Sequence, residues 1–158
     1  MDHPRYAEDI RAGESAELGS FTLSRAELMS FAERWDPQGF HIDQATAEAG
    51  RFGDVIASGV QSLAIFQRLC ILSPAFNWAV IAGTRLREVR FRRPVYPDTT
   101  LYGGIRVQSV DIDQARQRAT VCQDGWLDDA QGRVFDVQME ILVHCRPALS
   151  LMRALSFL

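Results

Sequence analysis

A carboxylate and an imidazole stand close together in one short stretch of this sequence. Asp36 and His41 lie five residues apart within residues 35–43 (WDPQGFHID), a segment that we expect to form a loop between two helices. A carboxylate can accept a proton from water while an imidazole orients or reprotonates the other reactant, so the pair suits chemistry with water. The spacing alone is a weak signal, because Asp36 could simply end its helix and His41 could be an ordinary loop histidine.

A glycine at the start of the most apolar predicted helix is the second chemical feature. Gly59 sits at or just inside the N-terminus of that helix, where backbone N–H groups are unpaired and the helix dipole is positive. Without a side chain there, a ligand carbonyl can approach the amide closely. A thioester that gains or loses a proton at its α carbon develops enolate charge on its oxygen, which such an amide stabilises. The alternative is a glycine that only eases a tight turn.

The other histidines, the cysteines and the arginines give weaker signals. His3 is terminal and His144 lies on the polar side of a predicted strand, so we expect no metal and no other cofactor. The three cysteines are widely spaced, which indicates reduced thiols. All 17 basic residues are arginine, and five of them lie between residues 85 and 93. Arginine forks recognise phosphate, although a solvated strand face explains them as well.

Helices must position the acid and the imidazole. Ser24 and Glu27 form a capping box, after which apolar residues recur at helical spacing until Pro37 ends the helix. Asp43 is the expected N-cap of a short second helix, which Gly50 ends.

The rest of the chain predicts the fold class. Residues 58–72 are apolar almost all round, which indicates a helix buried in the core. One short strand is possible around Phe21. Alternating patterns predict four longer strands, at residues 84–93, 101–110, 116–126 and 135–145. Helices followed by long antiparallel strands indicate an α+β chain, and a curved sheet wrapped around the apolar helix is the hot-dog fold.

Composition restricts the classes of protein to which the chain can belong. A length of 158 residues predicts a single domain over residues 1–158. No apolar run is long enough to cross a bilayer and the N-terminus lacks a secretory signal, so we expect a cytoplasmic protein with no membrane partner. The net charge of −3 argues against nucleic acid as a partner.

Three motifs together resemble those of the MaoC-like dehydratases, a family that includes (R)-specific enoyl-CoA hydratases. Their order and spacing agree over about residues 20–145. The motifs are residues 35–43, then Phe52-Gly53 with Ala57-Ser58-Gly59, then residues 91–95 (FRRPV). The resemblance implies a hot-dog fold, usually dimeric, that acts on acyl chains carried on coenzyme A or acyl carrier protein.

The same resemblance implies roles for individual residues. It makes Asp36 and His41 the catalytic pair and the Gly59 amide the donor to the thioester oxygen. Six further residues are expected to contact the substrate: Phe40, Phe52, Ser58, Val60, Arg92 and Arg93.

Three positions depart from the family pattern. Gly39 stands where proline is common, and Ser58 stands where many members have histidine. Asp98 replaces a turn glycine, so this aspartate has to adopt a glycine-like conformation. None of these changes removes the acid–base pair.

The sequence therefore predicts a hydratase or dehydratase that interconverts trans-2-enoyl and 3-hydroxyacyl thioesters. We expect a homodimer or an assembly of dimers. Two alternatives remain open, a hot-dog thioesterase and a non-catalytic protein that binds acyl thioesters. The thioesterase would use a carboxylate and water on the thioester bond, and the binding protein would not need a placed acid–base pair.

Overall fold

The computed structural model describes residues 3–147. The single domain predicted for residues 1–158 extends past this range, and residues 1–2 and 148–158 lie outside the described part. In chain order the elements are η1 (Ala7–Asp9), β1 (Ser15–Leu23), α1 (Arg25–Trp35), α2 (Gly39–Ile42), α3 (Gln44–Ala49), α4 (Gly59–Leu72), η2 (Pro74–Phe76), β2 (Val80–Phe91), β3 (Thr99–Asp113), β4 (Arg118–Asp129) and β5 (Gly132–His144), where η denotes a 3-10 helix.

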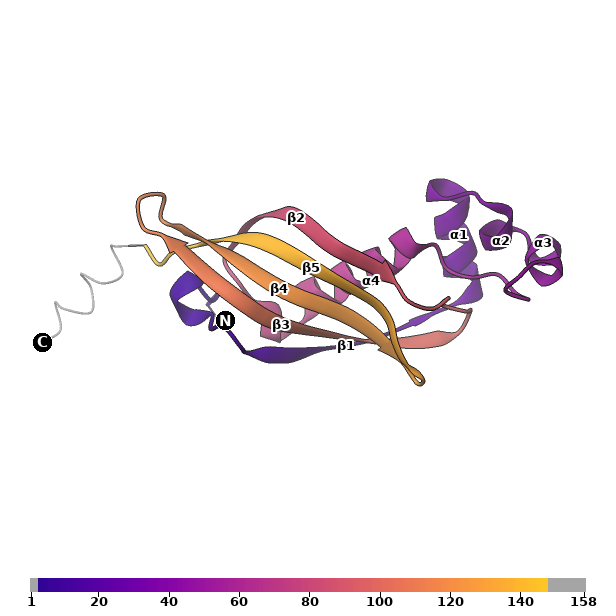
Figure 1. Ribbon diagram of the computed structural model, residues 1–158, viewed down its shortest axis with the longest axis horizontal. Coiled ribbons are helices and arrows are strands. Elements are labelled where there is room, and N and C mark those ends of the chain that lie inside the picture. The colour runs from indigo at the N-terminus through magenta and orange to yellow at the C-terminus, as the bar shows by residue number, and fades with distance from the viewer. Residues whose placement is uncertain (1–2, 148–158) are drawn as a thin grey trace, which may run out of the picture.

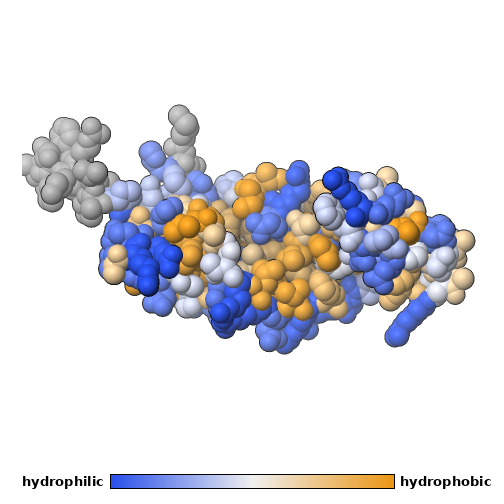
Figure 2. Space-filling view, turned by 90° about the horizontal axis from the view of Figure 1, so that it is seen from above, coloured by the Kyte–Doolittle hydropathy of each residue, from blue (hydrophilic) through white to orange (hydrophobic). Residues whose placement is uncertain are grey.

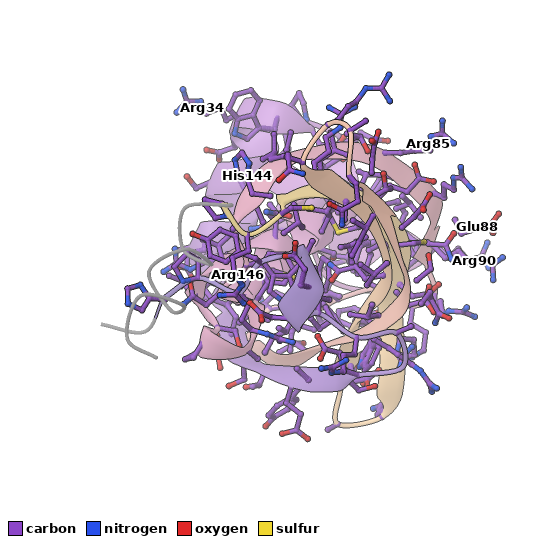
Figure 3. All side chains as sticks on the ribbon, turned by 90° about the vertical axis from the view of Figure 1, so that its left-hand side faces the viewer. Arg34, Arg85, Glu88, Arg90, His144 and Arg146 are labelled. Carbon is purple, nitrogen blue, oxygen red and sulfur yellow. The ribbon has the colours of Figure 1, made fainter. Side chains whose placement is uncertain are left out.

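The five strands form one antiparallel sheet in the order β1-β3-β4-β5-β2. The sheet is long, α4 lies along one side of it, and α1, α2 and α3 gather beyond one end (Figure 1). Seen along the long axis of the molecule, the strands curve as a wall (Figure 3). A curved antiparallel sheet with a long helix on its inner side is the hot-dog fold, and the predicted α+β class is confirmed.

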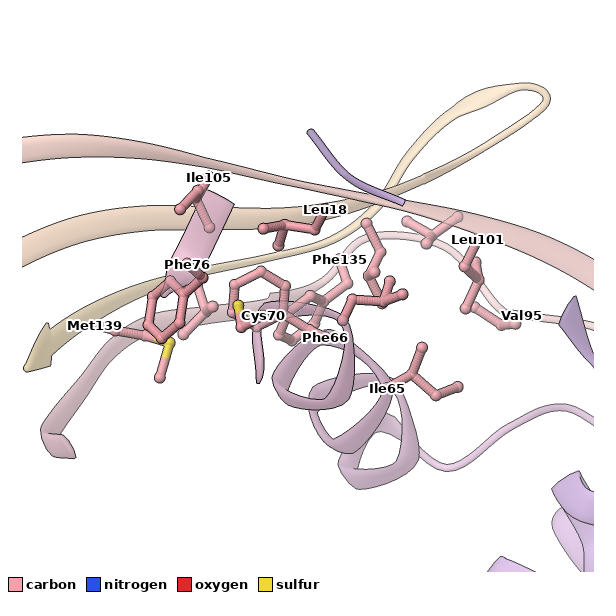
Figure 4. Packing of buried hydrophobic residues seen from close by; sticks show 14 of the residues in the cluster. Leu18, Ile65, Phe66, Cys70, Phe76, Val95, Leu101, Ile105, Phe135 and Met139 are labelled. Atoms are coloured by element: carbon pink, nitrogen blue, oxygen red, sulfur yellow. The ribbon is translucent and has the colours of Figure 1, made fainter. Parts of the chain in front are cut away.

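Large apolar side chains hold α4 against the sheet. The rings of Phe66 on α4 and Phe135 on β5 are fully buried, with centroids 5.9 Å apart (Figure 4). Burying a side chain of this size stabilises the fold by about 1.5–3 kcal/mol. A Cβ added to Gly125 of β4 would lie 2.1 Å from the Phe66 ring. The absence of a side chain at Gly125 therefore lets the helix approach the sheet closely.

The opposite face of α4 is exposed. Val60, Ile71 and Leu72 are 56, 61 and 64% exposed, and β2 beside the helix is exposed along its whole length. Seen from above the view of Figure 1, apolar side chains gather near the middle of the molecule (Figure 2). The sequence predicted a helix covered on most sides. The structure differs because the sheet of one chain covers only one side of α4.

The local predictions around α1 and α3 are confirmed. Ser24 accepts the Glu27 N–H while the Glu27 carboxylate accepts the Ser24 N–H, which completes the capping box of α1. Asp43 caps α3 by accepting the N–H of Thr46 at 2.7 Å. Asp98 adopts the glycine-like conformation that its position requires, with φ of +61°.

Two elements differ from their predicted form. The strand expected as a short one around Phe21 is the nine-residue β1, which pairs along β3. Residues 39–42 form the single turn of α2 inside the segment that we expected to be a loop. Among the helices of the described part, none is both long enough and apolar enough to cross a membrane.

Candidate active site

A cavity of about 420 Å³ lies where three parts of the chain meet. These are the segment from the end of α1 to α2, the N-terminal end of α4, and the chain at the end of β2. Asp36, His41 and Gly59 all line this cavity. Residues that the sequence predicted from separate motifs are therefore brought to one place.

The acid and the imidazole face each other across a short gap. Asp36 is the C-cap of α1, where its N–H donates to Ala32 O at 2.8 Å. His41 lies in α2, so the expectation of a loop is corrected for this residue. One helical turn after Pro37 brings the imidazole back toward the carboxylate, and His41 Nε2 lies 3.4 Å from Asp36 Oδ2.

The imidazole is fixed by a backbone carbonyl. His41 is buried, and its Nδ1 lies 2.6 Å from the carbonyl oxygen of Ile56. A carbonyl only accepts hydrogen bonds, so Nδ1 carries a hydrogen and Nε2 faces Asp36. In the neutral ring Nε2 is an acceptor, like the carboxylate opposite. Two acceptors this close together can both receive hydrogens from one molecule that lies beside them, such as water.

The Asp36 carboxylate accepts hydrogen bonds at both oxygens. Ser58 Oγ donates to Oδ2 at 2.6 Å, and Gln38 Nε2 donates to Oδ1 at 2.8 Å. The Ser58 hydroxyl, followed by the Gln38 amide, holds the pKa of Asp36 below its usual value, and the nearby His41 acts in the same direction. Asp36 is therefore a carboxylate at neutral pH.

The start of α4 presents one unused donor to the cavity. Ser58 caps the helix, because its side chain accepts the Val60 N–H and its carbonyl accepts the N–H groups of Gln61 and Ser62. Within the described residues, the Gly59 N–H donates no hydrogen bond. A free amide at a helix N-terminus can stabilise an oxyanion.

Space explains why residue 59 is glycine. Its φ is not in the left-handed region, so a turn does not require glycine here. A Cβ at this position would lie 2.8 Å from the ring of Phe91 at the end of β2. The absence of a side chain therefore lets the ring and any bound molecule approach the helix end closely.

The structure places five of the six predicted substrate contacts at the cavity wall, namely Phe52, Ser58, Val60, Arg92 and Arg93. Phe40 is not among the residues that line it. The Phe40 ring lies against the His41 imidazole, with centroids 4.3 Å apart, and so supports the imidazole from the side.

The arginines of β2 and the following segment are paired with carboxylates. Arg92 is bonded to Asp136, and Arg93 donates to Asp129 at 2.6 Å. Arg85 and Arg90 point outward from the edge of the sheet (Figure 3). These ion pairs indicate a structural role, and any phosphate at Arg92 or Arg93 would have to compete with the aspartates.

Three features of the cavity were not predicted from the sequence. The carbonyl of Ile56 is backbone, which carries no side-chain signal. Gln38 and Phe91 stood inside the recognised motifs but without an assigned role. Their residue types, an amide beside an acid and an aromatic near a helix start, are the only signals that the sequence offered.

The other reactive groups of the chain lie outside this arrangement. Burial raises the pKa of the Cys70 thiol to about 12, so Cys70 is not a nucleophile at neutral pH. Within residues 3–147, no three potential ligand side chains come together as a metal site.

The fold and this cavity place the chain among the hot-dog proteins, and the sequence identifies the family within them. Residues 10–125 match the family described as MaoC like domain. The chain therefore belongs to the MaoC-like domain family.

The chain is also similar to individual proteins and solved structures. The uncharacterized protein YdeM of Bacillus subtilis is 37% identical over 100 residues, which are 63% of this chain and 71% of that protein. The MaoC-like dehydratase from Rhodospirillum rubrum is 26% identical, with a TM-score of 0.81 over 90% of this chain and 99% of that one. The fold, at 22% identity, is shared with the (R)-hydratase PhaJ1 from Pseudomonas aeruginosa, with a TM-score of 0.67 over 90% and 88% of the two chains.

Proposed function

We propose that this protein is a hydro-lyase that interconverts trans-2-enoyl and 3-hydroxyacyl thioesters, carried on coenzyme A or on acyl carrier protein. The observation that carries the proposal is the cavity itself. It holds two facing acceptors, Asp36 Oδ2 and His41 Nε2, at 3.4 Å, together with the unpaired N–H of Gly59. Membership in the MaoC-like family and the fold shared with an (R)-hydratase support it.

The geometry suggests how the reaction proceeds. Water donates one hydrogen bond to Asp36 and one to His41, and its oxygen adds to the β carbon as one O–H bond breaks. The released proton passes through the pair to the α carbon, where a C–H bond forms. Negative charge that develops on the thioester oxygen is stabilised by the Gly59 N–H. Dehydration is the same path in reverse.

Typical magnitudes indicate how much each part of the proposed site contributes to the rate acceleration. General acid–base catalysis contributes roughly 10²–10⁴-fold to a rate. One oxyanion donor contributes about 10²–10³-fold in kcat when its removal is measured. The proposal therefore assigns part of the rate acceleration to the acid–base pair and part to the Gly59 N–H.

Crotonyl-CoA distinguishes the proposal from its two alternatives. A hydratase removes the enoyl absorbance and releases no free thiol, a thioesterase releases thiol, and a binding protein binds the compound and changes neither signal. The matched control is the Asp36→Asn variant, in which the carboxylate becomes a neutral amide of the same size. The proposal would be contradicted if the folded wild-type protein neither hydrated crotonyl-CoA nor dehydrated the corresponding 3-hydroxyacyl-CoA. The same assay with a crotonyl-acyl carrier protein identifies the preferred carrier.

We also propose that the active form is a homodimer or an assembly of dimers. The exposed apolar face of α4 and the unpaired edge of β2 support this proposal. Both surfaces lie next to the cavity, since Val60 of the α4 face and Phe91 at the end of β2 both line it. A second copy on this side would close the site from water.

A further inference from the structure

Ser58 links the two halves of the candidate site through a single hydroxyl group. The residue is fully buried at the N-cap of α4. Its Oγ accepts the Val60 N–H at 3.3 Å and donates to Asp36 Oδ2 at 2.6 Å. A serine hydroxyl has one hydrogen, and here that hydrogen is committed to the carboxylate. The sequence predicted a contact between Ser58 and the substrate, but this hydrogen is already in use.

The bond to Asp36 differs from the bond that Gln38 makes to the same carboxylate. Gln38 is exposed, and its long side chain has several rotatable bonds. Ser58 has a short side chain, and the first turn of α4 holds it in the core. A buried hydroxyl that donates to a carboxylate makes a strong, charge-assisted hydrogen bond. Ser58 is therefore the donor that can fix the orientation of Asp36.

We propose that Ser58 is a positioning residue, which keeps the Asp36 carboxylate charged, directed at His41, and in register with the Gly59 N–H. Ser58 acts through Asp36 and does not itself touch the reacting atoms. The kinetic consequence rests on the proposed hydro-lyase function. The bond between Ser58 and Asp36 does not, so it can be tested whether or not the protein hydrates enoyl thioesters.

The charged groups around Asp36 leave the Ser58 hydroxyl as the main group that stabilises the negative charge of this carboxylate. From α2, His41 Nε2 lies at 3.4 Å. From the end of β2, Arg92 and Arg93 line the same cavity, but each is bonded to an aspartate. The first turn of α4 has no charged residue. The exposed neighbours on its own helix carry opposite charges, Glu33 and Arg34.

A purely structural role for Ser58 makes a different prediction. If the serine only capped α4, its removal would lower stability and leave the titration of Asp36 unchanged. Ser73 is the matched control, because this buried serine at the other end of α4 also accepts a backbone N–H at 3.3 Å, from Ala75. Ser73→Ala therefore removes an equivalent capping bond far from the carboxylate.

The first test is a carbon-detected NMR titration of aspartate-labelled protein, with Asp36 assigned from the Asp36→Asn variant. In Ser58→Ala the pKa of Asp36 should rise, and in Ser73→Ala it should not. Glycine is a tolerated N-cap and lowers stability less than alanine does at this position. Ser58→Gly therefore covers the case in which Ser58→Ala fails to fold. An Asp36 pKa that is the same in wild type and in the folded Ser58 variants overturns the proposal.

The second test is the pH profile of crotonyl-CoA hydration. We expect kcat/KM at neutral pH to fall roughly 10- to 100-fold in Ser58→Ala, the amount that one hydrogen bond to a charged group represents. The acid limb should move to higher pH, because Asp36 then protonates more readily. A fall in rate without movement of that limb overturns the positioning role. Wild-type protein that is inactive refutes the proposed function alone, since the NMR titration still decides the role of Ser58.

Discussion

At the scale of single residues, the site depends on which atoms donate and which accept. His41 has one nitrogen bound to the Ile56 carbonyl, which leaves the other to face Asp36. Asp36 is held as a carboxylate by two neutral donors, so it is available as a base over a wide pH range. The pair is arranged before any substrate arrives, and preorganised groups of this kind need no rearrangement during reaction.

Asp36→Asn and His41→Gln should each remove nearly all hydration of a short trans-2-enoyl-CoA, a loss of roughly 10²–10⁴-fold. Each change keeps the size and hydrogen bonding of the side chain but removes its ability to exchange a proton at neutral pH. Because both residues are proposed to act on one water, the double variant should be little worse than either single variant. Turnover is measured with thermal melts as the folding control. A folded single variant with near-normal turnover would refute the assignment.

Gly59→Ala should lower hydration by about 10²-fold, because its methyl group stands beside the amide that is proposed to bind the thioester oxygen. Stability should change little, since alanine is a better helix former than glycine and the exposed Phe91 ring can move away from the added methyl group. The added methyl also meets the Phe91 ring, so the Phe91→Ala single and double variants are the controls. If removal of the ring restored full turnover to Gly59→Ala, the glycine would serve only to make room for Phe91.

At the scale of elements, one carboxylate ties together the segment that carries the site. Asp54, in the loop before α4, accepts two bonds from Arg25 at the start of α1, at 2.7 and 2.9 Å. It also accepts a bond from Gln44 at the start of α3, at 2.9 Å. Ile56, whose carbonyl fixes His41, lies two residues further along. Asp54 therefore holds the loop that sets the imidazole.

Asp54→Asn should lower the free energy of unfolding by about 0.5–1 kcal/mol at pH 7, because Arg25 loses its charged partner in an ion pair that solvent partly screens. Arg25, followed by Gln44, holds the pKa of Asp54 well below its usual value. The stabilisation is therefore present above the pKa of an aspartate in the unfolded chain, about 4, and is lost as the pH falls below it. Thermal melts should show a lower melting temperature for the variant at pH 7 and a difference from wild type that shrinks toward pH 3.

A second aspartate provides the control for this prediction. Asp113, the last residue of β3, pairs with Arg116 only three residues away, so this ion pair lies within one turn of the chain. Asp113→Asn should change the free energy of unfolding much less than Asp54→Asn does, because this ion pair is exposed to solvent. Equal effects of the two substitutions would show that Asp54 does not act as a tie between helices.

At the scale of the whole molecule, the uncovered side of α4 is the surface on which the proposed dimer depends. Apolar residues of α4 and the edge strand β2 form a continuous exposed surface, with a cavity of about 510 Å³ between them that Leu63, Ala64 and Leu86 line. Long unpaired strand edges and apolar patches of this kind are sites of association.

Sedimentation at micromolar concentration should show twice the mass of one chain, and Ala64→Glu should shift it to the monomer. The substitution places a charge in the middle of the α4 surface, where burial without a partner is strongly unfavourable. Ala130→Glu, in the exposed turn between β4 and β5, is the same substitution away from this surface and should leave the dimer intact. A monomeric wild-type protein would refute the proposed assembly.

The sequence by itself determined the features that depend on near neighbours in the chain. The Ser24 capping box, the Asp43 cap and the alternation of the long strands follow from side chains a few residues apart, so local pattern predicts them. The family resemblance predicted that Asp36, His41 and Gly59 would meet. Members of a family share a fold, so the resemblance implies contacts that local pattern does not predict.

Only the tertiary structure decided how those residues are connected. The Ile56 carbonyl reaches His41 across 15 residues, and the Ser58 hydroxyl reaches Asp36 across 22. A carbonyl is present in every residue, and a serine hydroxyl suits many partners, so neither contact leaves a signature in the sequence. The exposed side of α4 could not be predicted for the same reason. Apolar residues indicate that a face is to be covered, but the packing of the sheet decides which face the chain covers by itself.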